Sequence, residues 1–163
     1  MQSSHAPAAV LSAFDDPTLV AYGSLEPLVR LAERCGLPSL IAERVRMPVT
    51  ADGVGAFPAA KVMALVTGMV AGADSIADMD RLRHGAMERL FGGVRAPSTL
   101  GSFLRAFTHG HVKQLHAVAR RLLPQLASHT PLLPGAATVA YLDIDETIRR
   151  THGYAKQGAG YKH

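Results

Sequence analysis

The spacing of apolar residues changes near Gly135, and this change limits the folds that are open to the chain. Before residue 130, apolar side chains recur every three or four residues, as on one face of an α-helix. After a turn-rich stretch, residues 138–145 consist largely of strand-forming types and end in two aspartates. The absence of tryptophan and the abundance of alanine and leucine also favour helices. The pattern predicts a mainly α fold, in which a helical part precedes the start of a sheet.

This change of pattern divides the chain into three parts. Residues 1–20 show no sustained period and are expected to be an irregular lead-in. Residues 21–130 are expected to form a helical domain, and residues 136–163 the start of a second domain that contains a strand. Helices are expected to begin near these residues: Ser24, Pro38, Pro58, Ser75, Ala86, Pro97 and His111. Pro124 should kink or end the last of these helices.

The same spacing assigns side chains to the core. Leu28 and Cys35 fall on the apolar stripe of the first expected helix. In the helix that begins at Pro97, core packing fully explains the spacing of Leu100 and Phe103. A capped helix that ends in Arg105 is also compatible with a DNA-recognition helix. Both interpretations of this helix stay open.

The composition excludes several classes of protein. One cysteine, Cys35, cannot form an intrachain disulfide or a four-cysteine zinc site. The longest apolar stretch, residues 62–73, is interrupted and is shorter than the roughly 20 residues that span a bilayer. The first residues lack the basic and apolar regions of a signal peptide. We therefore expect a soluble, cytoplasmic protein with no membrane partner.

Basic residues are segregated along the chain. The formal net charge is +4, from 17 basic and 13 acidic residues. No acidic residue occurs between Glu88 and Asp143, whereas this interval contains Arg105, Arg120 and Arg121. Such a segment suits double-stranded DNA, because phosphate contacts supply most non-specific affinity. The alternative is a solvated helix face whose charge is balanced elsewhere. Three histidines of the interval are expected to face solvent or DNA rather than bind a metal: His109, His111 and His116.

Two carboxylates end the predicted strand. Side chains two apart on a strand share a face, so Asp143 and Asp145 are expected to project together, about 6.5–7 Å apart along the chain. Two carboxylates at the end of an apolar strand are costly unless a cation compensates them. Mg²⁺ or Mn²⁺ is the expected cation, since hard cations prefer oxygen ligands. The alternative is a strand end that emerges into a solvated turn, where acidic residues are ordinary.

Several short motifs precede and follow this predicted strand in the sequence. Residues 142–147 read Leu-Asp-Ile-Asp-Glu-Thr, and residues 153–161 read Gly-Tyr-Ala-Lys-Gln-Gly-Ala-Gly-Tyr. Upstream lie Ala-Gly-Ala-Asp-Ser-Ile-Ala-Asp-Met at 71–79, Arg-Leu-Arg at 81–83 and Pro-Ser-Thr-Leu-Gly-Ser-Phe-Leu-Arg at 97–105. Together they resemble the group-1 DDE transposases of bacterial insertion sequences, over most of residues 20–163. Their order and spacing make the combination more specific than any one motif.

The resemblance implies an RNase H-like catalytic domain, in which three acids hold two divalent metal ions for DNA cleavage and strand transfer. Asp145 matches the first catalytic aspartate, with Asp143 as a companion ligand, and Glu146 stands where the family often has serine. The later acids are expected beyond His163. We therefore expect the chain to be an inactive amino-terminal fragment of the enzyme, with a truncated catalytic domain. The implied partners are double-stranded element ends and, in the full-length enzyme, a second copy. Three further residues are expected to contact DNA beside the strand: Arg149, Arg150 and Lys156.

The same acid pair fits a second family. Apolar residues followed by Asp-x-Asp-x-Thr also begin the haloacid-dehalogenase-like phosphatases, in which Asp143 would be the nucleophile and Asp145 the acid/base. That motif usually opens its domain and commonly has glycine after the second aspartate. Here 142 residues precede Asp143, and Glu146 follows Asp145. A third interpretation makes the helical part a DNA- or partner-binding module without catalysis.

Overall fold

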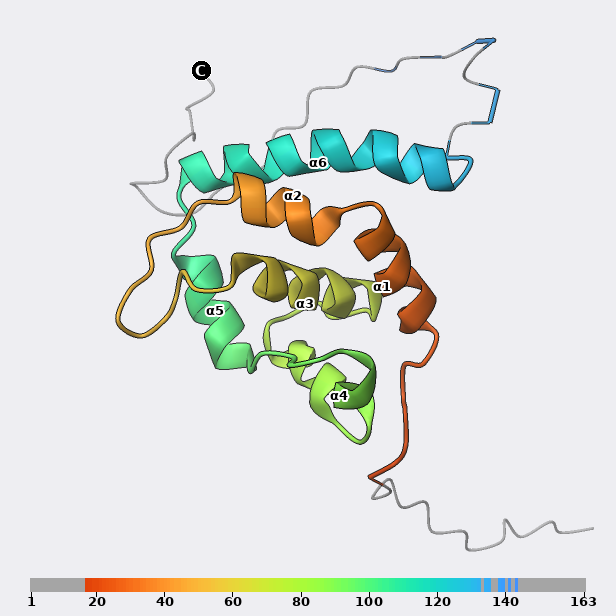
Figure 1. Cartoon of the computed structure of the whole chain (residues 1–163). Coiled ribbons are helices and arrows are strands. Elements are labelled where there is room, and N and C mark those ends of the chain that lie inside the picture. The colour runs from red at the N-terminus through yellow and green to blue at the C-terminus, as the bar shows by residue number, and fades with distance from the viewer. Residues whose placement is uncertain (1–16, 133, 136–137, 140, 142, 144–163) are drawn as a thin grey trace, which may run out of the picture.

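The regular structure of the chain is helical throughout the part that the computed structural model describes, namely residues 17–132, 134–135, 138–139, 141 and 143. The elements have these bounds (Figure 1): α1 Leu25–Arg34, α2 Leu37–Arg44, α3 Pro58–Val70, the 3₁₀ helix η1 Ala77–Arg83, α4 Met87–Leu90, α5 Pro97–Arg105 and α6 His109–His129. The predicted mainly helical fold is therefore confirmed. No helix in the described residues combines the length and the apolar character needed to cross a membrane.

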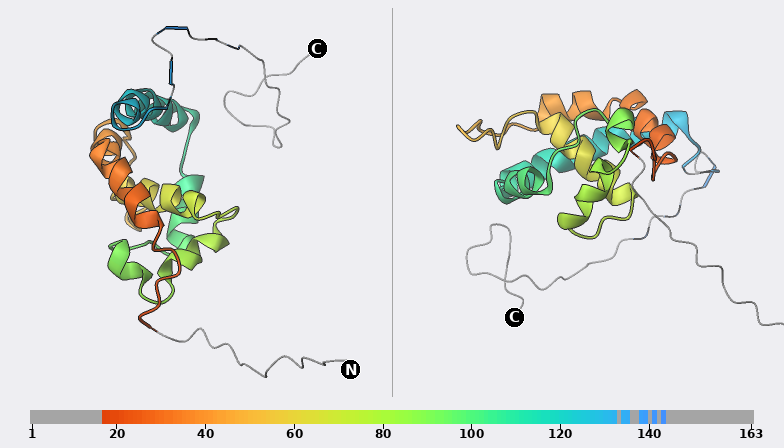
Figure 2. Two further views of the ribbon diagram at one scale, coloured as in Figure 1. Left: turned by 90° about the vertical axis from the view of Figure 1, so that its right-hand side faces the viewer. Right: turned by 90° about the horizontal axis from the view of Figure 1, so that it is seen from below.

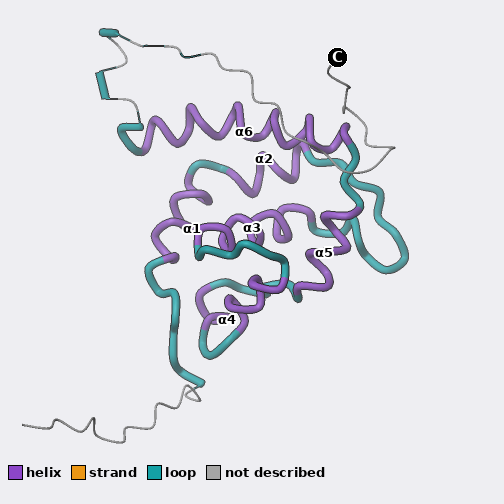
Figure 3. Tube along the Cα trace, turned by 180° about the vertical axis from the view of Figure 1, so that it is seen from behind, coloured by secondary structure: helices purple, strands orange, loops and turns teal. Residues whose placement is uncertain are grey.

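Helix α2 lies between two other helices. It packs against α6 on one side and α3 on the other, and Figure 1 shows the three stacked in the order α6, α2, α3. Helix α1 contacts all three, while η1 packs against α3, α4 and α5. Figure 3 shows the same order from behind, and the left view of Figure 2 shows α6 and α4 at opposite ends of the stack.

Two clusters of buried apolar side chains hold these helices together. The first joins α2 to α6 through Leu37, Ile41, Val45 and Val118. Ile41 is fully buried, and Leu115 and Leu122 pack against the same cluster from α6. The second cluster joins α1, η1, α4 and α5 through these residues: Leu25, Met79, Leu82, Met87, Phe91 and Leu100. Helix α2 is therefore packed on two sides, whereas α6, at one end of the stack, buries one side and leaves the other to solvent.

The structure confirms one core assignment in α1 and corrects another. Cys35, which directly follows α1, is 2% exposed, as its spacing predicts. Leu28 is 49% exposed, so its assignment to the core is wrong. Helix α1 packs instead through Leu25, Val29 and Ala32, which form a stripe one position away from Leu28. The helical period alone does not distinguish two adjacent stripes of similar apolar character.

Two helices differ from the sequence expectation. The helix expected after Ser75 is the 3₁₀ helix η1, although the Ser75 hydroxyl donates to Asp78 Oδ2 at 2.7 Å and receives the Asp78 backbone N–H at 3.3 Å. The last helix continues through Pro124 to His129, so an early end at Pro124 is wrong. Pro124 removes one backbone donor, but it lies on the exposed side of α6. Packing against α2 through Leu122 and Val118 stabilises the helix more than the missing bond weakens it.

The predicted strand at residues 138–145 is not seen in the residues that the structure describes. Thr138, Val139, Tyr141 and Asp143 belong to no helix or strand, and the other four residues lie outside the described part. The N–H groups of Thr138 and Val139 both donate to the carbonyl oxygen of Gly135, at 2.9 and 3.2 Å. A strand needs a neighbouring strand for its hydrogen bonds, and the described residues offer none. The RNase H-like domain stays a prediction.

A buried lysine closes the loop between α2 and α3. Lys61 is 3% exposed, and its Nζ donates to the carbonyl oxygens of Gly53 and Val54, each at 2.8 Å. The ammonium also lies 5.4 Å from the centre of the Phe103 ring, close enough to be attracted by it. Burial, and secondly the nearby Arg95, lower the pKa of Lys61. The loop is therefore attached to the core through one side chain.

The same loop has no room for a side chain at Gly55. A Cβ atom there would lie 2.1 Å from the carbonyl oxygen of Pro48, a backbone atom that cannot rotate away. We expect Gly55→Ala to lower the free energy of unfolding by about 1–3 kcal/mol, measured by urea denaturation. Gly92→Ala is the matched control, because a Cβ atom there meets nothing within 4 Å. Equal stability of the two variants would contradict this packing.

Candidate nucleic-acid-binding surface

The residues predicted to hold metal ions lie at or beyond the edge of the described structure. Asp143 is described and exposed, whereas Asp145, Arg149, Arg150 and Lys156 lie outside the described residues. Within the described part of the chain, no group of three or more His, Cys, Asp or Glu side chains is placed to hold a metal ion. The carboxylate pair and its metal ions therefore stay predictions, and the described structure bears on the DNA-binding residues of the helical part.

Acidic side chains in α1, α2 and η1 pair with basic side chains of the same element. The pairs are Glu26–Arg30, Glu43–Arg44 at 2.8 Å, Asp78–Arg81 at 2.8 Å and Asp80–Arg83 at 2.7 Å. Asp80 also lies 3.6 Å from His84. Such local pairing neutralises the surface of these elements. Among the described residues, no acidic side chain forms an ion pair with a basic side chain of α5 or α6.

Helix α6 presents basic side chains to solvent. Its 21 residues include no Asp or Glu, and Lys113, Arg120 and Arg121 are all exposed. The other side of the helix packs on α2 through Val118 and Leu122. We call Lys113, Arg120 and Arg121 the basic face of α6. Because packing turns this face outward, its positive charge is open to a polyanion.

Two arginines of the basic face meet a third from α1. Arg34, in the last turn of α1, lines a hollow of about 520 Å³ together with Arg120 and Arg121. Gly36 and Ser39, at the start of α2, line the same hollow. Gly36 has φ 74°, and the amino end of α2 that it begins carries partial positive charge. We call Arg34, Arg120 and Arg121 the arginine cluster.

Sequence reasoning did not select Arg34. It ends an ordinary amphipathic helix in which Glu26 and Glu33 precede it, so the charge along the chain gives no signal at this point. Arg120 and Arg121, by contrast, stand out because they lie in the acid-free interval. Folding brings the three together, since α1 contacts both α2 and α6.

Arg105, the remaining predicted DNA contact of the helical part, does not join the arginine cluster. It ends α5, and its Nη2 donates to the Ser102 hydroxyl at 3.1 Å. Figures 1 and 3 show α5 and α1 on opposite sides of the molecule. Leu100 and Phe103 are fully buried, so the spacing in α5 serves core packing. Arg105 itself is exposed and stays a predicted DNA contact of a separate surface.

One of the three histidines has a structural role. His111 Nδ1 accepts the backbone N–H of Thr108 at 3.0 Å, and Nε2 lies 3.0 Å from the carbonyl oxygen of Arg46. Because Nδ1 accepts a backbone N–H, Nε2 is placed to donate to the Arg46 carbonyl oxygen, and the ring links the start of α6 to the loop after α2. His111 is half-buried and is thus the exception among the three histidines, most of which were expected to face solvent or DNA. His109 and His116 are exposed, as expected.

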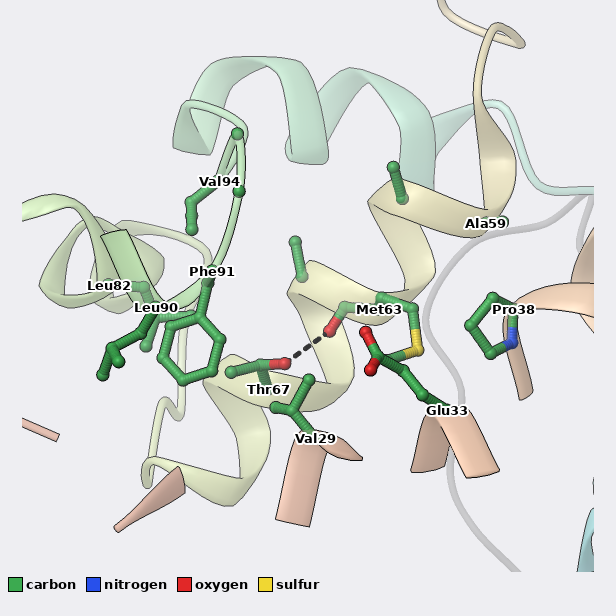
Figure 4. A pocket seen from close by; sticks show the side chains of 14 residues that line it. Val29, Glu33, Pro38, Ala59, Met63, Thr67, Leu82, Leu90, Phe91 and Val94 are labelled. Carbon is green, nitrogen blue, oxygen red and sulfur yellow. Dashed lines mark hydrogen bonds between the residues drawn. The ribbon is translucent and has the colours of Figure 1, made fainter. Parts of the chain in front are cut away.

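A second hollow, of about 340 Å³, lies between α1, α3 and the segment after α4. In Figure 4, Phe91 and Val94 approach it from one side and Met63 from another. The Thr67 hydroxyl donates to the Met63 carbonyl oxygen at 2.8 Å within α3. Glu33 supplies the charge in the described lining, and that charge is negative. An apolar hollow with a carboxylate does not suit a phosphate, so it is no part of the candidate DNA-binding surface.

No family model matches the chain, and neither the curated proteins nor the solved structures give a significant match. Function is therefore inferred from the basic face, the arginine cluster and the sequence motifs.

Proposed function

We propose that the chain supplies the DNA-holding helical domain of a DDE transposase, an enzyme that moves a DNA element by metal-dependent phosphoryl transfer. The order of the motifs at residues 71–79, 81–83, 97–105, 142–147 and 153–161 supports this proposal. The exposed, acid-free basic face of α6 supports it independently. The observation that carries DNA binding is the arginine cluster, because three cations from two helices line one hollow.

The arginine cluster binds phosphates of the DNA backbone in this proposal. A guanidinium group has a planar set of donors that matches two phosphate oxygens at once. Contacts to phosphates position a protein on DNA without reading its sequence. Each neutralised phosphate releases condensed counterions, so the affinity depends on salt. The helical domain therefore holds DNA of any sequence, and selection of an element end requires other contacts.

Catalysis in this proposal belongs to the residues that follow the helical domain. Asp145, with Asp143 as a companion, would hold one of the two Mg²⁺ or Mn²⁺ ions that the family resemblance implies. Such ions activate a water or a 3′-hydroxyl group and stabilise the leaving oxygen. Arg149, Arg150 and Lys156 neutralise the phosphate that approaches them. The resemblance implies three catalytic acids, and it matches the first of them to Asp145.

A DNA-binding module without catalysis is the second candidate function. The described residues favour this candidate, because their regular elements are all helices. The basic face of α6 belongs to these helices and does not depend on the predicted strand. Both candidates predict the same DNA binding by the arginine cluster. They differ in the chemistry assigned to Asp143 and Asp145.

Replacing Arg120 and Arg121 with alanine removes two of the three charges of the arginine cluster. We expect the wild-type chain to bind unrelated duplexes with similar affinity, and log affinity to fall with log salt by about 0.9 per phosphate contacted. The double variant should bind each duplex more weakly and lower the slope by about one for each arginine. Fluorescence anisotropy of labelled duplexes at several salt concentrations, with monodisperse protein, measures both quantities.

Arg81→Ala combined with Arg83→Ala is the matched control. It removes the same amount of positive charge from η1, where each arginine already pairs with an aspartate. Loss of exposed pairs of this kind costs little stability, so the fold is retained. The control variant should bind duplexes nearly as well as the wild type. Equal losses in both double variants, or a signal that does not change with salt, would show that the arginine cluster is only a solvated surface.

The 163-residue chain by itself should cleave neither DNA nor phosphate esters. One carboxylate pair does not supply the three acids that hold two metal ions in the proposed enzyme. Incubation of a DNA substrate and of a generic phosphate ester with Mg²⁺ or Mn²⁺ tests this expectation. Metal-dependent DNA cleavage that Asp145→Ala abolishes would show that fewer acids suffice. Ester hydrolysis that Asp143→Ala abolishes would favour a phosphatase instead.

A further inference from the structure

One exposed aromatic side chain is held in an unusual backbone conformation. Phe57 is 71% exposed, and its φ of 51° and ψ of 54° lie in the left-handed region. No other non-glycine residue in the described part of the chain has a positive φ. This conformation is unfavourable for any residue with a Cβ atom, so it persists where the surroundings impose it. The contacts around Phe57 must therefore hold its backbone in this conformation.

Residues before and after Phe57 in the chain hold it in place. Before it, Gly55 packs against the Pro48 carbonyl oxygen so closely that a Cβ atom would lie 2.1 Å away. After it, Pro58 begins α3, and the Phe57 carbonyl oxygen accepts the backbone N–H of Lys61 at 3.2 Å. The buried Lys61 ammonium holds the loop, as described above. The ring is therefore presented to solvent from a rigid position rather than from a free loop.

A basic side chain lies beside this ring. The guanidinium carbon of Arg95, in the segment between α4 and α5, is 5.8 Å from the centre of the Phe57 ring. Arg95 is exposed, so its remaining donors are open to an anion. The loop at residues 46–57 contains one acid, Asp52, and one basic residue, Arg46, so its formal charges balance. An aromatic face and a cation are thus combined in one exposed place.

The loop is attached to the helix that carries the basic face. The Arg46 N–H donates to Gln114 Oε1 at 2.8 Å, and the Arg46 carbonyl oxygen lies 3.0 Å from His111 Nε2. Figure 1 shows this loop, drawn in yellow-orange, on the side of the molecule where α6 begins. At 1.5 Å per residue, His111 and Arg120 are about 14 Å apart along α6. The loop that Phe57 ends therefore begins beside the helix that carries the basic face.

We propose that Phe57 and Arg95 form a platform on which an unpaired base of DNA stacks. This inference rests on the proposed DNA binding and adds the kind of DNA end that is preferred. The base covers the open face of Phe57, and Arg95 contacts the phosphate of the same nucleotide. Stacking on an aromatic ring accepts any base, because every base has a π-face. Paired bases inside a duplex have no free face, so the platform favours a duplex with a single-stranded overhang over a blunt one.

A single fluorophore tests the platform directly. The chain contains no tryptophan, so Phe57→Trp places the only indole of the protein at the proposed site. We expect a duplex with an overhang to quench this indole and to shift its emission, while a blunt duplex leaves it nearly unchanged. Val49→Trp is the matched control, since Val49 belongs to the same loop and is 72% exposed. Its indole should show no preference for the overhang.

Affinities measured on unlabelled protein provide an independent readout. Phe57→Ala should weaken binding of the overhang duplex about 5- to 150-fold, the range expected for loss of one stacked base. Phe57→Tyr keeps the aromatic face and should retain the affinity, whereas Arg95→Ala should lower it. The blunt duplex should bind Phe57→Ala and Phe57→Tyr as it binds the wild type. Circular dichroism confirms that each variant keeps its helices.

The outcomes separate the platform from the proposed function. If duplexes bind in a salt-dependent way but quench the two indoles equally, or not at all, the platform is overturned and backbone binding stands. Equal affinity of Phe57→Ala and the wild type for the overhang duplex overturns it too. If neither duplex binds at low salt, DNA binding itself is wrong, and the platform is wrong with it. A preference for the overhang that Phe57→Ala abolishes supports both.

Discussion

The burial of α2 between α3 and α6 determines how the surface of this protein is arranged. Leu37 and Ile41 are buried there, and Val118 of α6 packs against them. Burying an apolar side chain of this size contributes about 1.5–3 kcal/mol. An exposed ion pair contributes about 0–1 kcal/mol, so apolar contacts rather than charges orient α6. With its apolar side held by α2, the helix turns Arg120 and Arg121 to solvent.

The same packing joins chain segments that are distant in sequence. Because α1 contacts both α2 and α6, Arg34 arrives beside the arginines of α6. Similarly, Lys61 draws the loop after α2 onto α3, and Phe57 ends that loop in a fixed conformation. In the proposed DNA binding, one place offers charge to phosphates, and the other offers an aromatic face to a base. Helix α6 carries two arginines of the first place and is hydrogen-bonded to the start of the loop that ends in the second.

The helical domain could be predicted from sequence because its signals are local. Pro58 and Pro97 open helices where their fixed φ angle suits the first turn. The burial of Cys35 follows from its place on an apolar stripe. The assignment of Leu28 to the core is wrong, and the helix does not end at Pro124, because neighbouring helices decide which stripe is buried and whether a helix continues past a proline. A local pattern contains neither of these facts.

The binding residues were predictable only in part. Arg120 and Arg121 stand out because no acid surrounds them in sequence, whereas Arg34 follows two glutamates. Phe57 and Arg95 are separated by the whole of α3, η1 and α4, and the positive φ of Phe57 has no glycine or asparagine to announce it. The carboxylate pair gives the opposite case. The sequence of Asp143 and Asp145 predicts a metal-binding role, but a two-metal site of the expected kind also needs acids from elsewhere in the fold.

The most direct test of DNA binding by the arginine cluster is a map of the contacted residues. Amide chemical shifts of isotope-labelled protein, recorded during titration with a blunt duplex, provide this map. We predict the largest shifts at Arg34, Gly36, Arg120 and Arg121, with those of η1 and α4 unchanged. Shifts concentrated in η1 and α4, with α6 and the start of α2 unaffected, would contradict it.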